Sequence, residues 1–116
     1  MRLVVSLLLP VIFFACSSGP VPNNIFKPAS MQKVVYDLMQ VDEYMNVAKR
    51  DSAEDVRAKR SILYEQVFRI HNTTRKEFYS SYKYYQQHPD LHKALFDSLL
   101  SQMNRNNNTR LLPRKL

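Results

Sequence analysis

The sequence predicts an all-α fold, a small bundle of three to four helices. Its 116 residues contain one glycine, Gly19, whereas sandwiches, barrels and nucleotide-binding βαβ units need glycine at tight turns and phosphate loops. Apolar residues recur at steps of three and four along most of the chain, which is the spacing of one helix face. A chain this short forms one domain at most and leaves little room for a deep active site.

The chain is strongly basic, with 17 Lys and Arg against 10 Asp and Glu and a net charge of +7. Such a charge suggests nucleic acid, an anionic membrane or an acidic partner without choosing among them. The single cysteine excludes an internal disulfide framework.

Residues 1–15 are predicted to be a signal peptide. After Arg2, the segment from Leu3 to Phe14 is apolar except for Ser6 and Pro10. A helix of that length reaches about 18 Å, whereas a hydrocarbon core is about 30 Å thick, so we do not expect the segment to span a membrane.

The sequence around Cys16 resembles a bacterial lipobox. A bulky apolar residue, Phe13, lies three positions before the cysteine, and the small Ala15 directly precedes it. The resemblance implies cleavage before Cys16 and acylation of its sulfur and new amine with fatty acids such as palmitate. Because one acyl chain binds a membrane only marginally, two or three chains on Cys16 would give a durable anchor in the lipid bilayer.

Residues 16–27 are predicted to be the lipidated cysteine and a flexible tether, since prolines, asparagines and Gly19 interrupt any periodicity there. Ile25 and Phe26 are candidates to pack back onto the domain. Residues 28–105 are predicted to form the helical domain, and residues 106–116 a basic, frayed tail.

Four helices are expected within the helical domain. The first extends from about Pro28 to Arg50, and its wide apolar surface predicts contact with two neighbouring helices. The second, capped by Asp51 or Ser52, extends to about His71. Its expected apolar stripe is Val56, Leu63, Val67 and Ile70.

Thr74 and Glu77 fit a capping box that begins the short third helix. Pro89 suits the first turn of the fourth helix, which is expected to extend to about Asn104. The run Asn106 to Asn108 is expected to end that helix.

Two segments, residues 28–42 and 78–91, contain a set of residues whose order and spacing are informative. The residues are Pro28, Met31, Asp37, Phe78, Ser81, Tyr84, Tyr85, His88 and Pro89. In this order they resemble a family of small lipoproteins of Bacteroidetes-type bacteria, the family catalogued as domain of unknown function 4296. The family implies a helical, membrane-anchored protein and brings no established activity. In lipoproteins generally, Ser17 after the cysteine fits sorting to the outer membrane. In these bacteria, the absence of acidic residues from Ser17 to Asn24 favours its periplasmic side.

No catalytic or metal-binding constellation is expected, and no cofactor. His88 and His92 are four residues apart, but Pro89 places His88 at a helix boundary, and no cysteine or acidic cluster completes a metal shell. The sequence also lacks the glycine elbow of a nucleophile and a glycine-rich phosphate loop. We therefore do not expect an enzyme.

The expected third helix carries the densest cluster of aromatic residues in the mature chain. Tyr79, Tyr82, Tyr84 and Tyr85 cannot all lie on one helix face with Phe78. Exposed tyrosines suit a partner surface. The plainer interpretation is that tyrosine replaces Phe and Leu in a thin, wet core.

These features together predict a membrane-anchored lipoprotein of the cell envelope that acts as a non-enzymatic interaction or scaffold module for an envelope protein partner. The alternative is a carrier of a small ligand, lipid or glycan, or an accessory subunit of an envelope enzyme. No nucleic acid partner is expected, because a lipidated extracytoplasmic protein rarely meets one.

Overall fold

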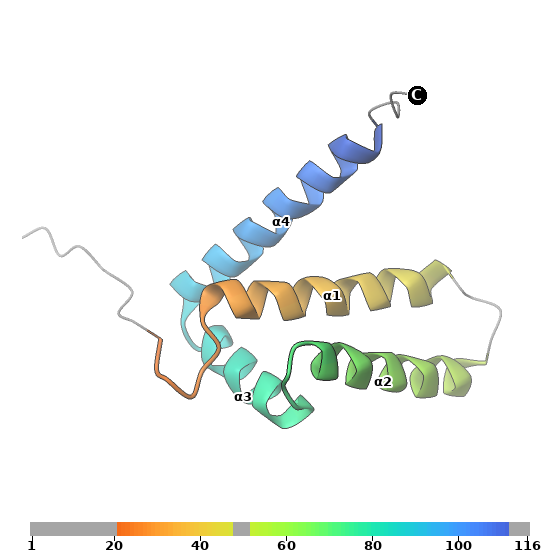
Figure 1. Ribbon diagram of the computed structural model, residues 1–116, viewed down its shortest axis with the longest axis horizontal. Coiled ribbons are helices and arrows are strands. Elements are labelled where there is room, and N and C mark those ends of the chain that lie inside the picture. Colours follow the sequence, from red (N-terminus) through yellow and green to blue (C-terminus); the bar gives the residue numbers. More distant parts are fainter. Residues whose placement is uncertain (1–20, 48–51, 112–116) are drawn as a thin grey trace, which may run out of the picture.

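The computed structural model describes residues 21–47 and 52–111, and within these it contains four α-helices and no strand (Figure 1). The helices are α1 (Pro28–Val47), α2 (Ala53–Ile70), α3 (Arg75–Gln86) and α4 (Pro89–Leu111). The predicted all-α fold is therefore confirmed. The expected signal peptide, residues 1–15, and Cys16 lie outside the described residues.

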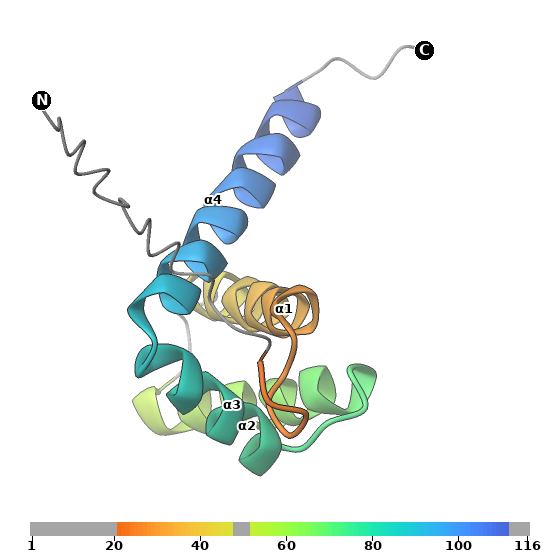
Figure 2. The same ribbon diagram turned by 90° about the vertical axis from the view of Figure 1, so that its left-hand side faces the viewer.

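Helices α1 and α2 run antiparallel, side by side, and α3 crosses the end of this pair where α1 begins and α2 ends (Figures 1 and 2). Helix α4 starts beside α3, crosses α1 and then diverges from the other helices. Helix α1 thus packs against both α2 and α4, as its wide apolar surface predicts.

The core lies where the four helices meet. Met31, Val34 and Leu38 of α1 face Val67 and Phe68 of α2, and Phe78 and Tyr85 of α3 and Leu95 and Leu99 of α4 complete the buried cluster. The Phe68 and Phe78 rings lie 5.4 Å apart, centroid to centroid, and Phe68 and Tyr85 are completely buried. Aromatic side chains therefore supply much of the area buried in this thin core.

The segment before α1 packs onto the domain, as we expected for Ile25 and Phe26. Ile25 is buried and Phe26 is half-buried against the core. Both helix N-caps are also confirmed: Ser52 caps α2, and Thr74 forms a capping box with Glu77.

The expected stripe of α2 is wrong at its end, because Ile70 is 72% exposed while Phe68 is buried. Ile70 is the last residue of α2, and the chain turns directly after it at His71 and Asn72. The end of this apolar stripe, at Ile70, therefore lies past the part of α2 that the other helices cover.

The prediction that Asn106 to Asn108 end the fourth helix is also wrong, since α4 continues to Leu111. Asparagine costs a helix only a few tenths of a kcal/mol per residue relative to alanine. A tertiary contact opposes that cost here, because the Asn106 side-chain amide donates to the Tyr36 hydroxyl across 2.6 Å. A second bond between the side chains of Gln32 and Gln102 (2.9 Å) also joins α1 to α4. The frayed tail predicted from residue 106 is thus helical through Leu111.

None of the helices in the described part of the chain is both long and apolar enough to cross a membrane.

Candidate functional site

A cleft of about 780 Å³ opens where the segment before α1, the start of α1 and the α2–α3 turn meet. Its lining comprises Asn23, Asn24, Ile25, Phe26, Ser30, Lys33, Val34, Ile70, His71, Asn72, Thr73 and Glu77. We call it the tether-end cleft, because residues 23–26, near the end of the predicted tether (residues 16–27), form one wall.

The wall formed by residues 23–26 is held to α3 by hydrogen bonds to the backbone of one residue, Phe26. The Phe26 amide donates to Ser81 Oγ (3.1 Å), and the Tyr85 hydroxyl donates to the Phe26 carbonyl (2.8 Å). Ser81 and Tyr85 are completely buried, and burial raises the pKa of the Tyr85 phenol. We call these contacts the Phe26 clamp. Because a buried polar group without a partner costs about 1–3 kcal/mol, the clamp favours one position of the segment.

The opposite wall of the cleft is the α2–α3 turn. Asn72 adopts a positive φ of 52°, which asparagine tolerates better than most residues. The Thr73 amide then donates to the Phe68 carbonyl (2.9 Å). The turn is thereby closed onto the last turn of α2.

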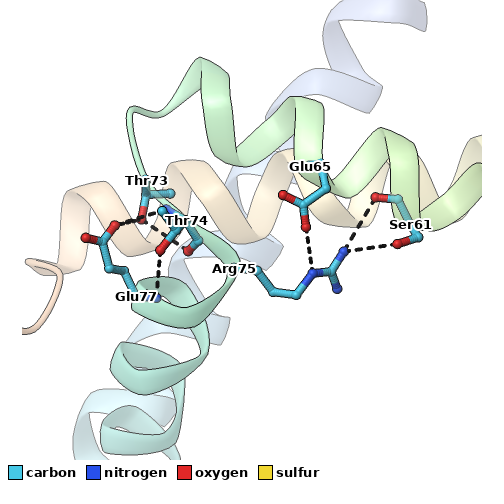
Figure 3. A network of polar contacts seen from close by, with 6 residues as sticks. All are labelled: Ser61, Glu65, Thr73, Thr74, Arg75 and Glu77. Atoms are coloured by element: carbon cyan, nitrogen blue, oxygen red, sulfur yellow. Dashed lines mark hydrogen bonds and ion pairs between the residues drawn. The ribbon is translucent and has the colours of Figure 1, made fainter.

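A side-chain network holds the start of α3 in place (Figure 3). Glu77 accepts from the Thr74 amide and the Thr73 hydroxyl, each at 3.0 Å, and these hydrogen bonds, that of Thr73 foremost, lower the pKa of the Glu77 carboxyl. Arg75 pairs with Glu65 on α2 (2.7 Å) and also contacts Ser61. Since Thr73 and Glu77 line the cleft, the network fixes the shape of this wall.

A hydrogen-bond partner for His71 lies on α1. Its Nε2 is 2.6 Å from Oδ2 of Asp37, and the imidazole is 19% exposed. The pair connects α1 to the end of α2 directly beside the cleft. Sequence reasoning missed this contact, because 34 residues separate the two side chains.

A second polar contact lies between α1 and α2, outside the cleft. The Tyr64 hydroxyl donates to Asp42 (2.8 Å), and Arg60 Nε lies 3.2 Å from the same carboxylate without the geometry of a hydrogen bond. Burial, and next the bond to Asp42, raises the pKa of Tyr64 to about 12. The neutral phenol therefore persists well above neutral pH.

The structure separates the four tyrosines that were predicted as a partner surface. Tyr79 is 44% exposed, Tyr82 and Tyr84 are half-buried, and Tyr85 is completely buried in the core. Tyr85 is therefore wrong as a surface residue, because its ring fills the core and its hydroxyl belongs to the Phe26 clamp. Tyr79 is the most exposed of the four, and its ring lies 5.1 Å from that of Phe78, centroid to centroid.

The histidines near the start of α4 contact aromatic rings. His88 stacks on Tyr84 with 3.9 Å between ring centroids, and His92 lies 4.7 Å from Phe96. No group of three or more His, Cys, Asp or Glu side chains that could hold a metal ion occurs among the described residues.

The chemistry of the cleft is mixed. Asparagine amides, Lys33 and Glu77 offer donors, acceptors and charge, and the exposed Ile70 and half-buried Phe26 offer apolar contact. Such a lining suits recognition of a chain or ligand that is itself partly polar.

The fold and the cleft define a class: a small all-helical domain whose N-terminal segment is clamped onto its third helix. The chain belongs to the family described as a domain of unknown function (DUF4296), whose model matches residues 22–109. The match includes residues 22–26 and therefore most of the clamped segment. No curated protein and no solved structure gave a significant match.

The nine residues that carried the family resemblance include both side chains of the Phe26 clamp. Ser81 and Tyr85 hold Phe26, Met31 and Phe78 are buried in the core, and Asp37 pairs with His71. The pattern therefore contains residues that attach the beginning of the domain to its second half.

Proposed function

We propose that this protein is a lipid-anchored, non-enzymatic module of the cell envelope that holds a partner protein in the tether-end cleft. The observation that carries the proposal is the position of the cleft. One wall is residues 23–26, near the end of the predicted tether, and the Phe26 clamp fixes that segment to the domain. A chain anchored through Cys16 would present this cleft close to the bilayer.

The predicted lipobox supports the anchor, and Cys16 itself lies outside the described residues. We expect a Cys16→Ala variant to be released from membranes washed at about 1 M salt, which screens charge contacts, whereas the native protein stays bound. We expect intact-mass analysis of the native protein to show cleavage before Cys16 and added acyl chains. A variant that resists the salt wash, or a native chain with a free thiol and an uncut leader, would contradict the anchor.

The proposed role of the cleft is tested with a matched pair of substitutions on α2. Ile70 lines the cleft and is 72% exposed, whereas Ile62, 58% exposed, is not among the lining residues. In pull-downs from solubilised envelopes, the Ile70→Asp variant is expected to recover at least tenfold less of a stoichiometric partner than the parent chain does, because a charge replaces an apolar contact. Ile62→Asp is expected to retain the partner. Equal recovery by both variants would exclude the cleft as the binding site.

A second candidate function is the carriage of a small lipid or glycan. The volume of the cleft, about 780 Å³, supports it, because ligand pockets commonly measure about 300–1,000 Å³. This alternative predicts a co-purified lipid or glycan, seen by native mass spectrometry, that Ile70→Asp removes. Recovery of a protein partner without such a molecule favours the first proposal.

A further inference from the structure

The outward face of α3 carries positive charge and an aromatic ring. Lys76, Tyr79, Ser80 and Lys83 follow each other at helical spacing, and all four are exposed. Neither lysine forms an ion pair with any residue in the described part of the chain. The one acid of α3, Glu77, lies to the side of this face and bonds to Thr73 and Thr74.

The Phe26 clamp fixes this helix next to the point where the chain enters the domain. Ser81 and Tyr85, on the opposite face of α3, hold Phe26. Figure 2 shows the segment before α1 and the helix α3 at the same end of the molecule. The position of α3 relative to the predicted tether is therefore set by hydrogen bonds of the fold.

The part of the predicted tether that precedes the described residues is short. Five residue steps separate Cys16 from Val21, the first described residue. Even fully extended, five residues span only about 17 Å. An acylated Cys16 would therefore keep the α3 end of the bundle near the headgroups.

We propose that the outward face of α3 docks on anionic phospholipid headgroups, with Lys76 and Lys83 against the phosphates and Tyr79 at the headgroup level. The charge complementarity and the position beside the tether carry this inference, and tyrosine is enriched at that depth of a bilayer. Each lysine near an anionic surface strengthens binding about fivefold. The contact gives the proposed anchored module a defined orientation, with the tether-end cleft, lined by Glu77, at the edge of the contact.

The test uses a chain that begins at Ser17, so that acylation cannot contribute to binding. The described core residues all lie between Ile25 and Leu99, so this chain retains them, and circular dichroism checks its helices. We expect it to sediment with vesicles of phosphatidylglycerol and phosphatidylcholine, and to bind pure phosphatidylcholine vesicles at least tenfold more weakly.

Single substitutions locate the contact. Lys76→Gln and Lys83→Gln are each expected to lower partitioning into anionic vesicles about fivefold. The control is Arg57→Gln, which removes one exposed charge about 20 Å along α2 from its C-terminal end. At about 0.1 M salt the screening length is about 10 Å, so this variant should stay within twofold of the parent. An equal loss in all three variants would overturn the proposal, as would unchanged binding in both lysine variants.

A fluorescence measurement tests the orientation, because the chain contains no tryptophan. In a Tyr79→Trp variant the emission is expected to shift to the blue on anionic vesicles. The matched Tyr44→Trp variant, at an exposed site near the far end of α1, is expected to show no shift. The reverse result would overturn the proposed face, and so would a chain that ignores the vesicles but binds RNA or an acidic polypeptide through these lysines. Since the chain carries no acyl group, these outcomes are independent of whether Cys16 is lipidated in the native protein.

Discussion

At the scale of single residues, several polar contacts connect segments that are far apart in the sequence. Phe26 bonds to Ser81 and Tyr85, and Asp37 pairs with His71. The buried contacts of Phe26 matter more for stability than exposed ion pairs, since a surface pair contributes about 0–1 kcal/mol. Removing one buried partner leaves the other without a hydrogen bond.

Tyr85→Phe tests the clamp at this scale. The substitution keeps the ring in the core and removes the donor to the Phe26 carbonyl, so we expect the free energy of unfolding to fall by about 1–2 kcal/mol in urea titrations. Tyr79→Phe, which removes a hydroxyl from a ring that is 44% exposed, is expected to change it by less than about 0.5 kcal/mol. Equal effects would contradict the clamp.

Tyr64 provides a prediction of pH dependence. Its pKa is raised to about 12 in the folded protein, against an ordinary value of 10.0. The folded state therefore binds the phenolic proton more tightly than the unfolded state does. The resulting contribution of Tyr64 to the free energy of unfolding is complete below pH 10 and is lost as the pH rises through about 12.

Base titration followed by tyrosinate absorbance is expected to show a late-ionising phenol that the Tyr64→Phe variant lacks. An Asp42→Asn variant should ionise earlier at Tyr64, since the bond and charge of Asp42 both raise that pKa. An unchanged titration curve in both variants would contradict this assignment.

At the scale of elements, local signals placed the helix starts better than the helix ends. The Ser52 cap and the capping box of Thr74 and Glu77 depend on neighbours within three residues, and both are confirmed. The end of α4 depends on α1 through the bond from Asn106 to Tyr36, so the asparagine run misled a prediction made from the sequence alone.

Thr74→Ala tests the start of α3. It removes the side-chain acceptor of the Glu77 amide, at 3.2 Å, and is expected to cost about 1 kcal/mol of stability, measured by urea unfolding. Ser80→Ala, at an exposed site within the same helix, is expected to be neutral or slightly stabilising. A loss from Ser80→Ala as large as that from Thr74→Ala would contradict the role of the box.

At the scale of the whole molecule, the two ends of the domain contribute unequally. Residues 21–26 close the core through Ile25 and the Phe26 clamp, whereas α4 beyond its crossing with α1 diverges from the bundle (Figure 1). The segment that would be named a linker by composition thus belongs to the domain.

Two truncations of a chain that starts at Ser17 test this asymmetry. Starting the chain at Lys27 is expected to cost about 3–6 kcal/mol, since Ile25 leaves the core and two buried hydroxyls lose their partners. Ending it at Asn104 removes the bond between Asn106 and Tyr36 and is expected to cost only about 1 kcal/mol. Thermal unfolding by circular dichroism distinguishes the two, and a reversed order would contradict the structure.

The all-α class, the helix starts and the family were predictable from the amino-acid sequence, because these follow from hydrophobic spacing, capping residues and motif order within short windows. Packing between distant elements sets the burial of Tyr85, the contact of Asp37 with His71, the exposure of Ile70 and the place of the segment before α1 in a wall of the cleft. Helical periodicity reports which residues share a face, and the packing of distant elements decides what that face contacts.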